Sequence, residues 1–133
     1  MNYFEPHLTP DELRAISAIG LAHMGDAVYE TLVRTWLCVH GKATGKELHR
    51  ATIALVCAQK QAELAQRVLP QLTEEELAVY KRGRNANVHA MPRSATPAQY
   101  HAATGLECLM GWLYLQGNKE RAEQLFRAMM EEE

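Results

Sequence analysis

The strongest constraint on the fold of this chain is a stripe of apolar residues spaced by three and four positions. Such spacing places side chains on one face of a helix. The stripe ends before Gly41, a residue type that commonly terminates helices. Its members are Leu21, Met24, Val28, Leu32, Trp36 and Val39. No segment alternates with period two for long enough to form a strand, so we predict an all-α fold.

Capping residues and apolar spacing predict further helices along the chain. Thr9-Pro10-Asp11-Glu12 has the capping hydroxyl, proline and acids typical of a helix start. Thr73 and Glu76 have the spacing of a capping box. The stretch 83–96 has no clean period and is punctuated by proline. The first predicted helix begins at 9–12. The others extend over 21–39, from 44 or 45 to 68, and over 73–82, 97–115 and 119–130.

The composition indicates one globular domain spanning residues 1–133. Hydrophobic residues make up 47% and charged residues 23% of the chain, which is ordinary for a packed domain. The odd number of cysteines (Cys38, Cys57 and Cys108) and their apolar neighbours predict buried free thiols in a reducing compartment. We see no leader peptide, and no apolar run approaches the ~18–20 residues of a membrane span. A cytoplasmic domain without membrane association is expected.

The distribution of charge is more informative than the net charge of −2. The stretch 77–106 contains no Asp or Glu. Within it, Lys81, Arg82, Arg84 and Asn85 surround a glycine at the end of a predicted helix. This combination suits contacts to RNA phosphates and 2′-hydroxyls, although cations at a helix C-terminus also simply favour the helix dipole. A second basic set includes Lys46 and Arg50.

Two acids lie within otherwise apolar helices. Asp26 follows Gly25, and Glu107 lies between Gly105 and Gly111. Small neighbours allow another backbone or a ligand to approach closely. Two converging carboxylates would suit Mg²⁺, which keeps several waters and activates them for attack on phosphate. The alternative for Asp26 is a carboxylate on the polar edge of its helix. Glu30, one turn later, is expected to pair with Arg34 rather than act as a third acid.

Three segments together resemble the bacterial Mini-ribonuclease III family, which consists of ribonuclease III catalytic domains without a double-stranded RNA-binding domain. The segments are 25–30 (GDAVYE), 81–86 (KRGRNA) and 104–115 (TGLECLMGWLYL). The resemblance implies an all-helical endonuclease, a two-fold homodimer, Mg²⁺ dependence and cleavage of double-stranded RNA to mature 23S ribosomal RNA precursors. By position, Asp26 matches the aspartate of the ribonuclease III signature and Glu107 the glutamate of its second acidic motif.

The chain departs from full-length ribonuclease III at two acidic positions. Ala22 stands where that enzyme has a glutamate, and Thr104 where it has an aspartate. With two acids instead of four, we expect weaker and mostly water-mediated Mg²⁺ coordination. The RNA-binding residues would be Lys81, Arg82, Arg84 and Asn85, with Lys46 and Arg50. A ribosomal protein bound to the substrate is a further candidate partner.

Two other functions stay open on the sequence alone. One is a non-catalytic ribonuclease III-like module that binds RNA during ribosome assembly, which the two missing acids favour. The other is a helical protein-interaction domain with no RNA role. Mg²⁺-dependent strand scission separates the first from an enzyme, and duplex RNA binding at low salt separates the second.

Overall fold

The computed structural model of the protein describes residues 1–87, 91 and 93–131, and within these ranges it contains helices but no strand. The prediction of an all-α fold is confirmed. His89, part of the predicted basic stretch, lies outside the described residues. The elements are α1 (Pro10–Arg14), α2 (Ala18–Val39), α3 (Gly45–Val56), α4 (Ala58–Val68), the 3-10 turn η1 (Leu69–Gln71), α5 (Glu74–Arg84), α6 (Pro97–Leu115) and α7 (Lys119–Met129).

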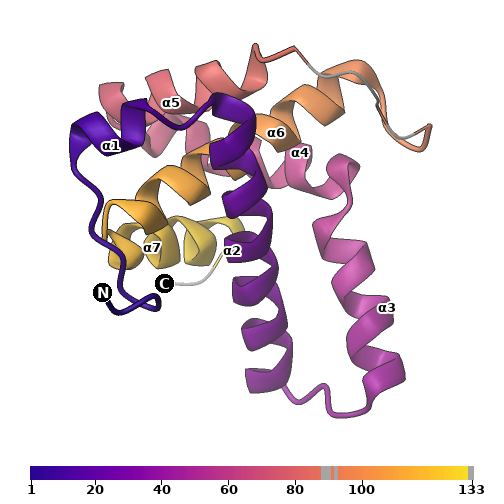
Figure 1. The fold of residues 1–133 in the computed structure, drawn as a ribbon. Coiled ribbons are helices and arrows are strands. Elements are labelled where there is room, and N and C mark those ends of the chain that lie inside the picture. Colours follow the sequence, from indigo (N-terminus) through magenta and orange to yellow (C-terminus); the bar gives the residue numbers. More distant parts are fainter. Residues whose placement is uncertain (88–90, 92, 132–133) are drawn as a thin grey trace.

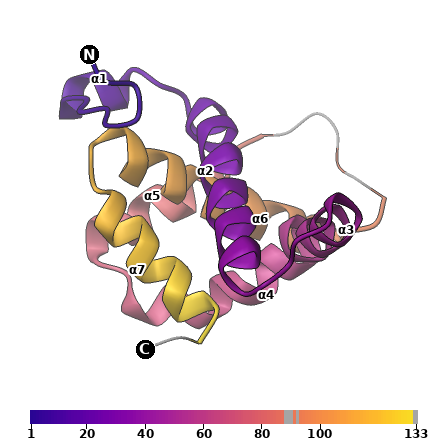
Figure 2. The same cartoon turned by 90° about the horizontal axis from the view of Figure 1, so that it is seen from below.

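Helix α6 is the centre of the fold. It packs against α2, α4, α5 and α7, and in both ribbon views α2 crosses over it (Figures 1 and 2). Most of α6 is buried, including Leu106, Leu109 and Leu113. A helix with this many covered sides must be apolar nearly all round, which explains the long apolar run in the sequence.

Paired glycines allow α2 and α6 to cross at backbone contact. A Cβ on Gly25 of α2 would lie 1.6 Å from the backbone oxygen of Glu107 on α6. At the next turn, a Cβ on Gly111 would lie 2.0 Å from the backbone oxygen of Leu21. Neither position can carry a side chain unless the helices separate. This crossing fixes the position of Asp26, which follows Gly25, relative to Glu107.

A second glycine pair fixes α5 against α6. A Cβ on Gly83 would lie 2.5 Å from the Cβ of Cys108, and one on Gly105 would lie 2.8 Å from the ring of Tyr80. The cations Arg82 and Arg84 flank Gly83 in the sequence. The end of α5 that carries them is therefore held at a defined position on α6.

The single helix predicted from residue 44 or 45 to 68 is wrong, because the structure breaks it at Cys57. Cys57 has an extended conformation (φ −64°, ψ 151°) between α3 and α4. Helix α3 packs along α2, whereas α4 packs against α6 and α7. One straight helix cannot present its apolar side to both surroundings. The break lets α3 extend away from the body beside the second half of α2 (Figure 1).

The cysteine prediction is half right. All three thiols are free, but only Cys108 is buried, while Cys38 and Cys57 are exposed. Cys38 lies in the last turn of α2, and Cys57 lies at the break before α4, so neither position is covered by the helices of the core.

Among the described residues, no helix is long and apolar enough to cross a membrane.

Candidate active site

A pocket of about 510 Å³ opens where α2, α4 and α6 meet. Asp26 and Glu107 both line it, so the structure brings together the two acids predicted from the sequence. Gln61 of α4 contributes a third polar side chain. The remaining lining residues are Ile19, Ala22, His23, Val56, Cys57, Ala58, Ser94, Tyr100, Ala103 and Thr104.

Asp26 and Glu107 differ in their environments. Asp26 is exposed, as expected for a carboxylate on the edge of its helix, while Glu107 is half-buried. Burial, together with hydrogen bonding and charge repulsion from Asp26, raises the pKa of Glu107 to about 8. A hydrogen bond from Gln61 acts in the opposite direction. Among the described residues that line the pocket there is no Lys or Arg, and without a metal ion the raised pKa favours the protonated form of Glu107 near neutral pH.

Gln61 is a site residue that the sequence analysis did not identify. It is only 2% exposed. Its Nε2 donates to the backbone oxygen of Val56 at 2.8 Å and to Glu107 Oε2 at 3.4 Å. Its Oε1 is buried and has no hydrogen-bond partner among the described residues. The available signal was its position: Gln61 shares the buried face of α4 with Leu64, Ala65 and Val68.

The donor set fits a hard divalent cation that keeps most of its water. Carboxylate and amide oxygens are the ligand type that Mg²⁺ prefers. Within the described part of the chain, no group of three or more His, Cys, Asp or Glu side chains is placed to hold a metal ion. Ala22 and Thr104, the positions of the two missing acids, line the same pocket. The Thr104 hydroxyl donates to the Tyr100 backbone oxygen at 3.0 Å. The site thus offers two carboxyl groups rather than a protein cage.

The predicted RNA-binding residues lie outside the pocket, in two groups. Lys81, Arg82, Arg84 and Asn85 are exposed at the end of α5. Arg82 Nη2 donates to the Ile16 backbone oxygen at 3.3 Å, and Arg84 Nε donates to Asn85 Oδ1 at 3.3 Å. The other group lies on α3.

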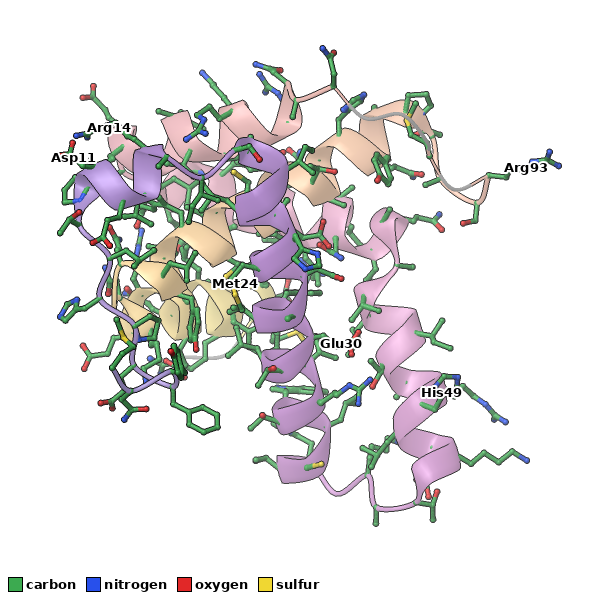
Figure 3. All side chains as sticks on the ribbon, viewed as in Figure 1. Asp11, Arg14, Met24, Glu30, His49 and Arg93 are labelled. Carbon is green, nitrogen blue, oxygen red and sulfur yellow. The ribbon has the colours of Figure 1, made fainter. Side chains whose placement is uncertain are left out.

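Lys46 and Arg50 are exposed on α3, the helix that extends away from the body. In Figure 3, the neighbouring His49 projects from the side of α3 that faces away from α2. Arg93, in the segment before α6, projects into solvent at the same side of the molecule (Figure 3). The structure therefore presents cations at the end of α5 and on α3, and none of them lines the pocket.

Glu30, a further polar residue of α2, lies as the sequence analysis expected. Glu30 pairs with Arg34 at 2.7 Å (Glu30 Oε2 to Arg34 Nη2), and it does not line the pocket that contains Asp26 among the described residues. Figure 3 shows Glu30 on the side of α2 that faces α3. His23 is exposed at the rim of the pocket.

Comparison with known proteins identifies the class of this protein. Residues 20–118 match the family model described as the ribonuclease III domain. The fold is also similar to a crystal structure of a protein from Fusobacterium nucleatum, with a TM-score of 0.79 and 29% sequence identity over 86% of this chain and 88% of that one. The matched range contains both acids and every predicted RNA-binding residue.

Sequence relatives narrow the class to one family. The chain is 45% identical over 108 residues to the Mini-ribonuclease 3 of Symbiobacterium thermophilum, covering 81% of this chain and 83% of that protein. It is 42% identical over 116 residues to the Mini-ribonuclease 3 of Enterococcus faecalis, covering 86% and 88%. The chain belongs to the Mini-ribonuclease 3 family, which makes it an endoribonuclease of the ribonuclease III type. That wider family typically depends on a metal ion and implies a double-stranded RNA substrate.

Proposed function

We propose that this protein is a Mg²⁺-dependent endoribonuclease that cleaves double-stranded RNA in the cytoplasm and matures the ends of 23S ribosomal RNA precursors. The observation that carries the proposal is the meeting of Asp26 and Glu107 in one pocket beside the Gly25 crossing. Two neighbouring carboxyl groups, of which Glu107 has a raised pKa, destabilise an apolar fold. Groups with perturbed pKa values are concentrated at functional sites.

Asp26 and Glu107 are the residues that would hold Mg²⁺ in this site, and Glu107 would release its proton when the ion binds. When bound, the ion supplies a polarised water and offsets the negative charge that develops on the phosphate. The exposed Asp26 carboxylate faces solvent and substrate, while the half-buried Glu107 is fixed by the helix crossing and by Gln61. The pair would orient the attacking water toward a phosphodiester. As the water oxygen bonds to phosphorus and loses a proton to solvent, the bond to the 3′-oxygen breaks and that oxygen takes up a proton. The products would carry a 5′-phosphate and a 3′-hydroxyl.

The cations outside the pocket are suited to hold the RNA backbone. Lys81, Arg82, Arg84 and Asn85 at the end of α5 form one contact area, and Lys46 and Arg50 on α3 form a second. A-form RNA is recognised mainly through its shape, phosphates and 2′-hydroxyls. Binding through a few such cations should be modest and sensitive to salt. Arg82 would exchange its hydrogen bond to the Ile16 backbone oxygen for a phosphate contact.

We also propose that the active form is a homodimer. Family membership supports this proposal, and two copies related by a two-fold axis would present two acid pairs to the two strands of one duplex. Light scattering on the purified protein tests it directly, with a mass twice the 15.0 kDa chain as the expected result. A ribosomal protein bound to the precursor is a further partner to include in cleavage assays.

The test of the proposed function is cleavage of purified duplex RNA and of a 23S precursor by the wild type, Asp26→Asn and Glu107→Gln. Each protein is assayed with Mg²⁺ and with EDTA. We expect cleavage by the wild type alone, and only with Mg²⁺. Equal cleavage by all three proteins would show that the activity does not come from this site.

A non-catalytic RNA-binding module is the second candidate, because Ala22 and Thr104 leave the pocket two acids short of full-length ribonuclease III. RNA binding without cleavage by the wild type, on both substrates and with Mg²⁺ present, would favour it over the enzyme.

A further inference from the structure

We propose that Gln61 is a positioning residue of the active site: its side-chain oxygen accepts a hydrogen bond from a water molecule held at the Asp26–Glu107 pair. The inference rests on the proposed function, since it takes that pair as the centre of the site. It adds a third helix, α4, to the reaction centre built from α2 and α6.

The orientation of the Gln61 amide is fixed by its surroundings. A backbone carbonyl can only accept a hydrogen bond, so the group that contacts the Val56 oxygen at 2.8 Å must be the NH₂ end of the side chain. That same NH₂ group lies 3.4 Å from Glu107 Oε2. The oxygen end is bonded to the same carbon as this NH₂ group, so it lies close to the Glu107 carboxyl group.

The side-chain oxygen of Gln61 lacks a hydrogen-bond partner among the described residues, although it is buried away from bulk water. Oε1 is buried and accepts no hydrogen bond from the described residues. A buried acceptor without a partner has lost its hydrogen bonds to water and gained none in return. The same face of α4 is otherwise apolar, with Leu64, Ala65 and Val68 all buried. An apolar side chain at residue 61 would avoid this cost, so the amide indicates a donor that is not among the described residues.

Water at the carboxyl pair is the donor that the chemistry favours. The pocket is lined by both polar and apolar side chains and, at about 510 Å³, is large enough for several waters. A Mg²⁺ ion with two protein carboxylates keeps most of its coordination positions as water. Such polarised waters are strong donors. An amide oxygen accepts their hydrogen bond without taking the proton, so it orients a water without changing its own charge.

Three variants of α4 test the inference. Gln61→Met removes both polar ends at similar length, and Gln61→Glu keeps an oxygen toward the pocket while its protonated form can still donate to the Val56 oxygen. Gln59→Met is the matched control, because Gln59 is exposed on α4 and lines a different hollow with Ala62 and Gln66. Mn²⁺ affinity is measured without RNA by electron paramagnetic resonance. Single-turnover cleavage and Tm are measured alongside.

We expect Gln61→Met to weaken Mn²⁺ binding and slow the cleavage step by about 10-fold each, the scale of residues that orient metal-bound groups. The KM for RNA should stay within about 2-fold. Gln61→Glu should recover the Mn²⁺ affinity, and Gln59→Met should match the wild type. If Gln61→Met fails to unfold cooperatively, Gln61→Asn replaces it, because the shortened amide draws its oxygen back and should give the same loss.

Three results would overturn the inference. The first is unchanged Mn²⁺ affinity with a lowered Tm, which would give Gln61 a purely structural role at the α3–α4 junction. The second is a raised KM for RNA with unchanged Mn²⁺ affinity, which would make an RNA hydroxyl the donor. The third is equal loss in the Met and Glu variants. If the wild type cleaves RNA normally and any of these three results is obtained, the proposed function still stands. A wild type that never cuts would defeat that function, while the Mn²⁺ comparison would still decide the role of Gln61.

Discussion

Gly25 and Glu107 touch through their backbones: a Cβ at Gly25 would lie 1.6 Å from the Glu107 carbonyl oxygen. The contact couples the stability of the fold to the geometry of the site, because Asp26, which follows Gly25, forms the acid pair with Glu107. Gly25→Ala should therefore force α2 away from α6, destabilise the fold by about 2–3 kcal/mol and reduce cleavage more than the unfolded fraction explains. Urea unfolding and cleavage assays measure the two effects.

Gly45→Ala is the control for this substitution. Gly45 is the first residue of α3, and no described atom lies within 4 Å of a Cβ added there. We expect its stability and activity to equal or slightly exceed those of the wild type. A Gly25→Ala protein as stable and active as Gly45→Ala would show that the crossing is looser than the structure indicates.

Replacing Glu107 by glutamine should stabilise the metal-free protein at alkaline pH. Burial and the neighbouring Asp26 raise the pKa of Glu107 to about 8. A group whose pKa is raised on folding contributes its full stability below the ordinary carboxyl pKa and loses it as the pH rises through the folded value. The wild type in EDTA should thus lose stability between about pH 5 and pH 9. Glu107→Gln should lose less.

Thermal unfolding at the two ends of this range measures the effect, which we expect to be a relative gain for Glu107→Gln of a few degrees at the alkaline end. Glu63→Gln serves as the control, because Glu63 is exposed on α4 and lines a different hollow. Parallel pH curves for Glu107→Gln and the wild type would contradict the assignment.

The buried ion pair between Glu76 and Arg121 should be the acid-sensitive link of the fold. Arg121 Nε and Nη2 donate to the two Glu76 carboxylate oxygens at 2.8 and 2.9 Å, and Nη2 also donates to the Gln71 backbone oxygen at 3.0 Å. These bonds from Arg121 lower the pKa of Glu76. The stability they add is present above the ordinary carboxyl pKa and is lost as the pH falls through the lowered one.

Arg121→Met should cost about 2–3 kcal/mol near neutral pH, because it leaves a buried carboxylate without its partner. The cost should shrink in acid. Arg127→Met breaks the exposed pair with Glu123 on the same helix and should cost less than about 0.5 kcal/mol. Urea unfolding at both pH values checks this, and equal costs for the two variants would contradict it.

Cations at the end of α5 should set the salt dependence of RNA binding. In an Asp26→Asn background, which prevents cleavage, Lys81→Ala and Arg84→Ala should each weaken duplex RNA binding. Each should also reduce the slope of log affinity against log salt by about 1. Arg127→Ala is the control, because Arg127 pairs with Glu123 on α7 and lines a hollow that contains no described residue of α5. Equal salt slopes for all four proteins would place the RNA elsewhere.

Local signals in the sequence predicted most of the fold. The helix start at Thr9 and the capping box at Thr73 form as expected, and the apolar stripe from Leu21 lies within α2. The break at Cys57 carries no glycine or proline signal. It arises because α3 and α4 pack against different partners, which is a property of the assembled fold rather than of the local residues.

The sequence predicts the acid pair but not the role of Gln61. The cost of burying each side chain explains the difference. A carboxylate within an apolar helix is conspicuous because burial of a charge is costly. A glutamine is neutral and common on helix surfaces, so its burial becomes evident only when α4 packs. What distinguishes Gln61 is its unpartnered oxygen, and only the three-dimensional structure shows this.

The most direct test of the central claim is an anomalous-scattering map from crystals of the wild type soaked in Mn²⁺. We expect a peak within ligand distance of Asp26 or Glu107 and facing Gln61, with waters completing the coordination. The same soak of Asp26→Asn crystals should lose the peak. A strong Mn²⁺ peak elsewhere, with the pocket between α2, α4 and α6 filled only by water, would contradict the assignment of this site.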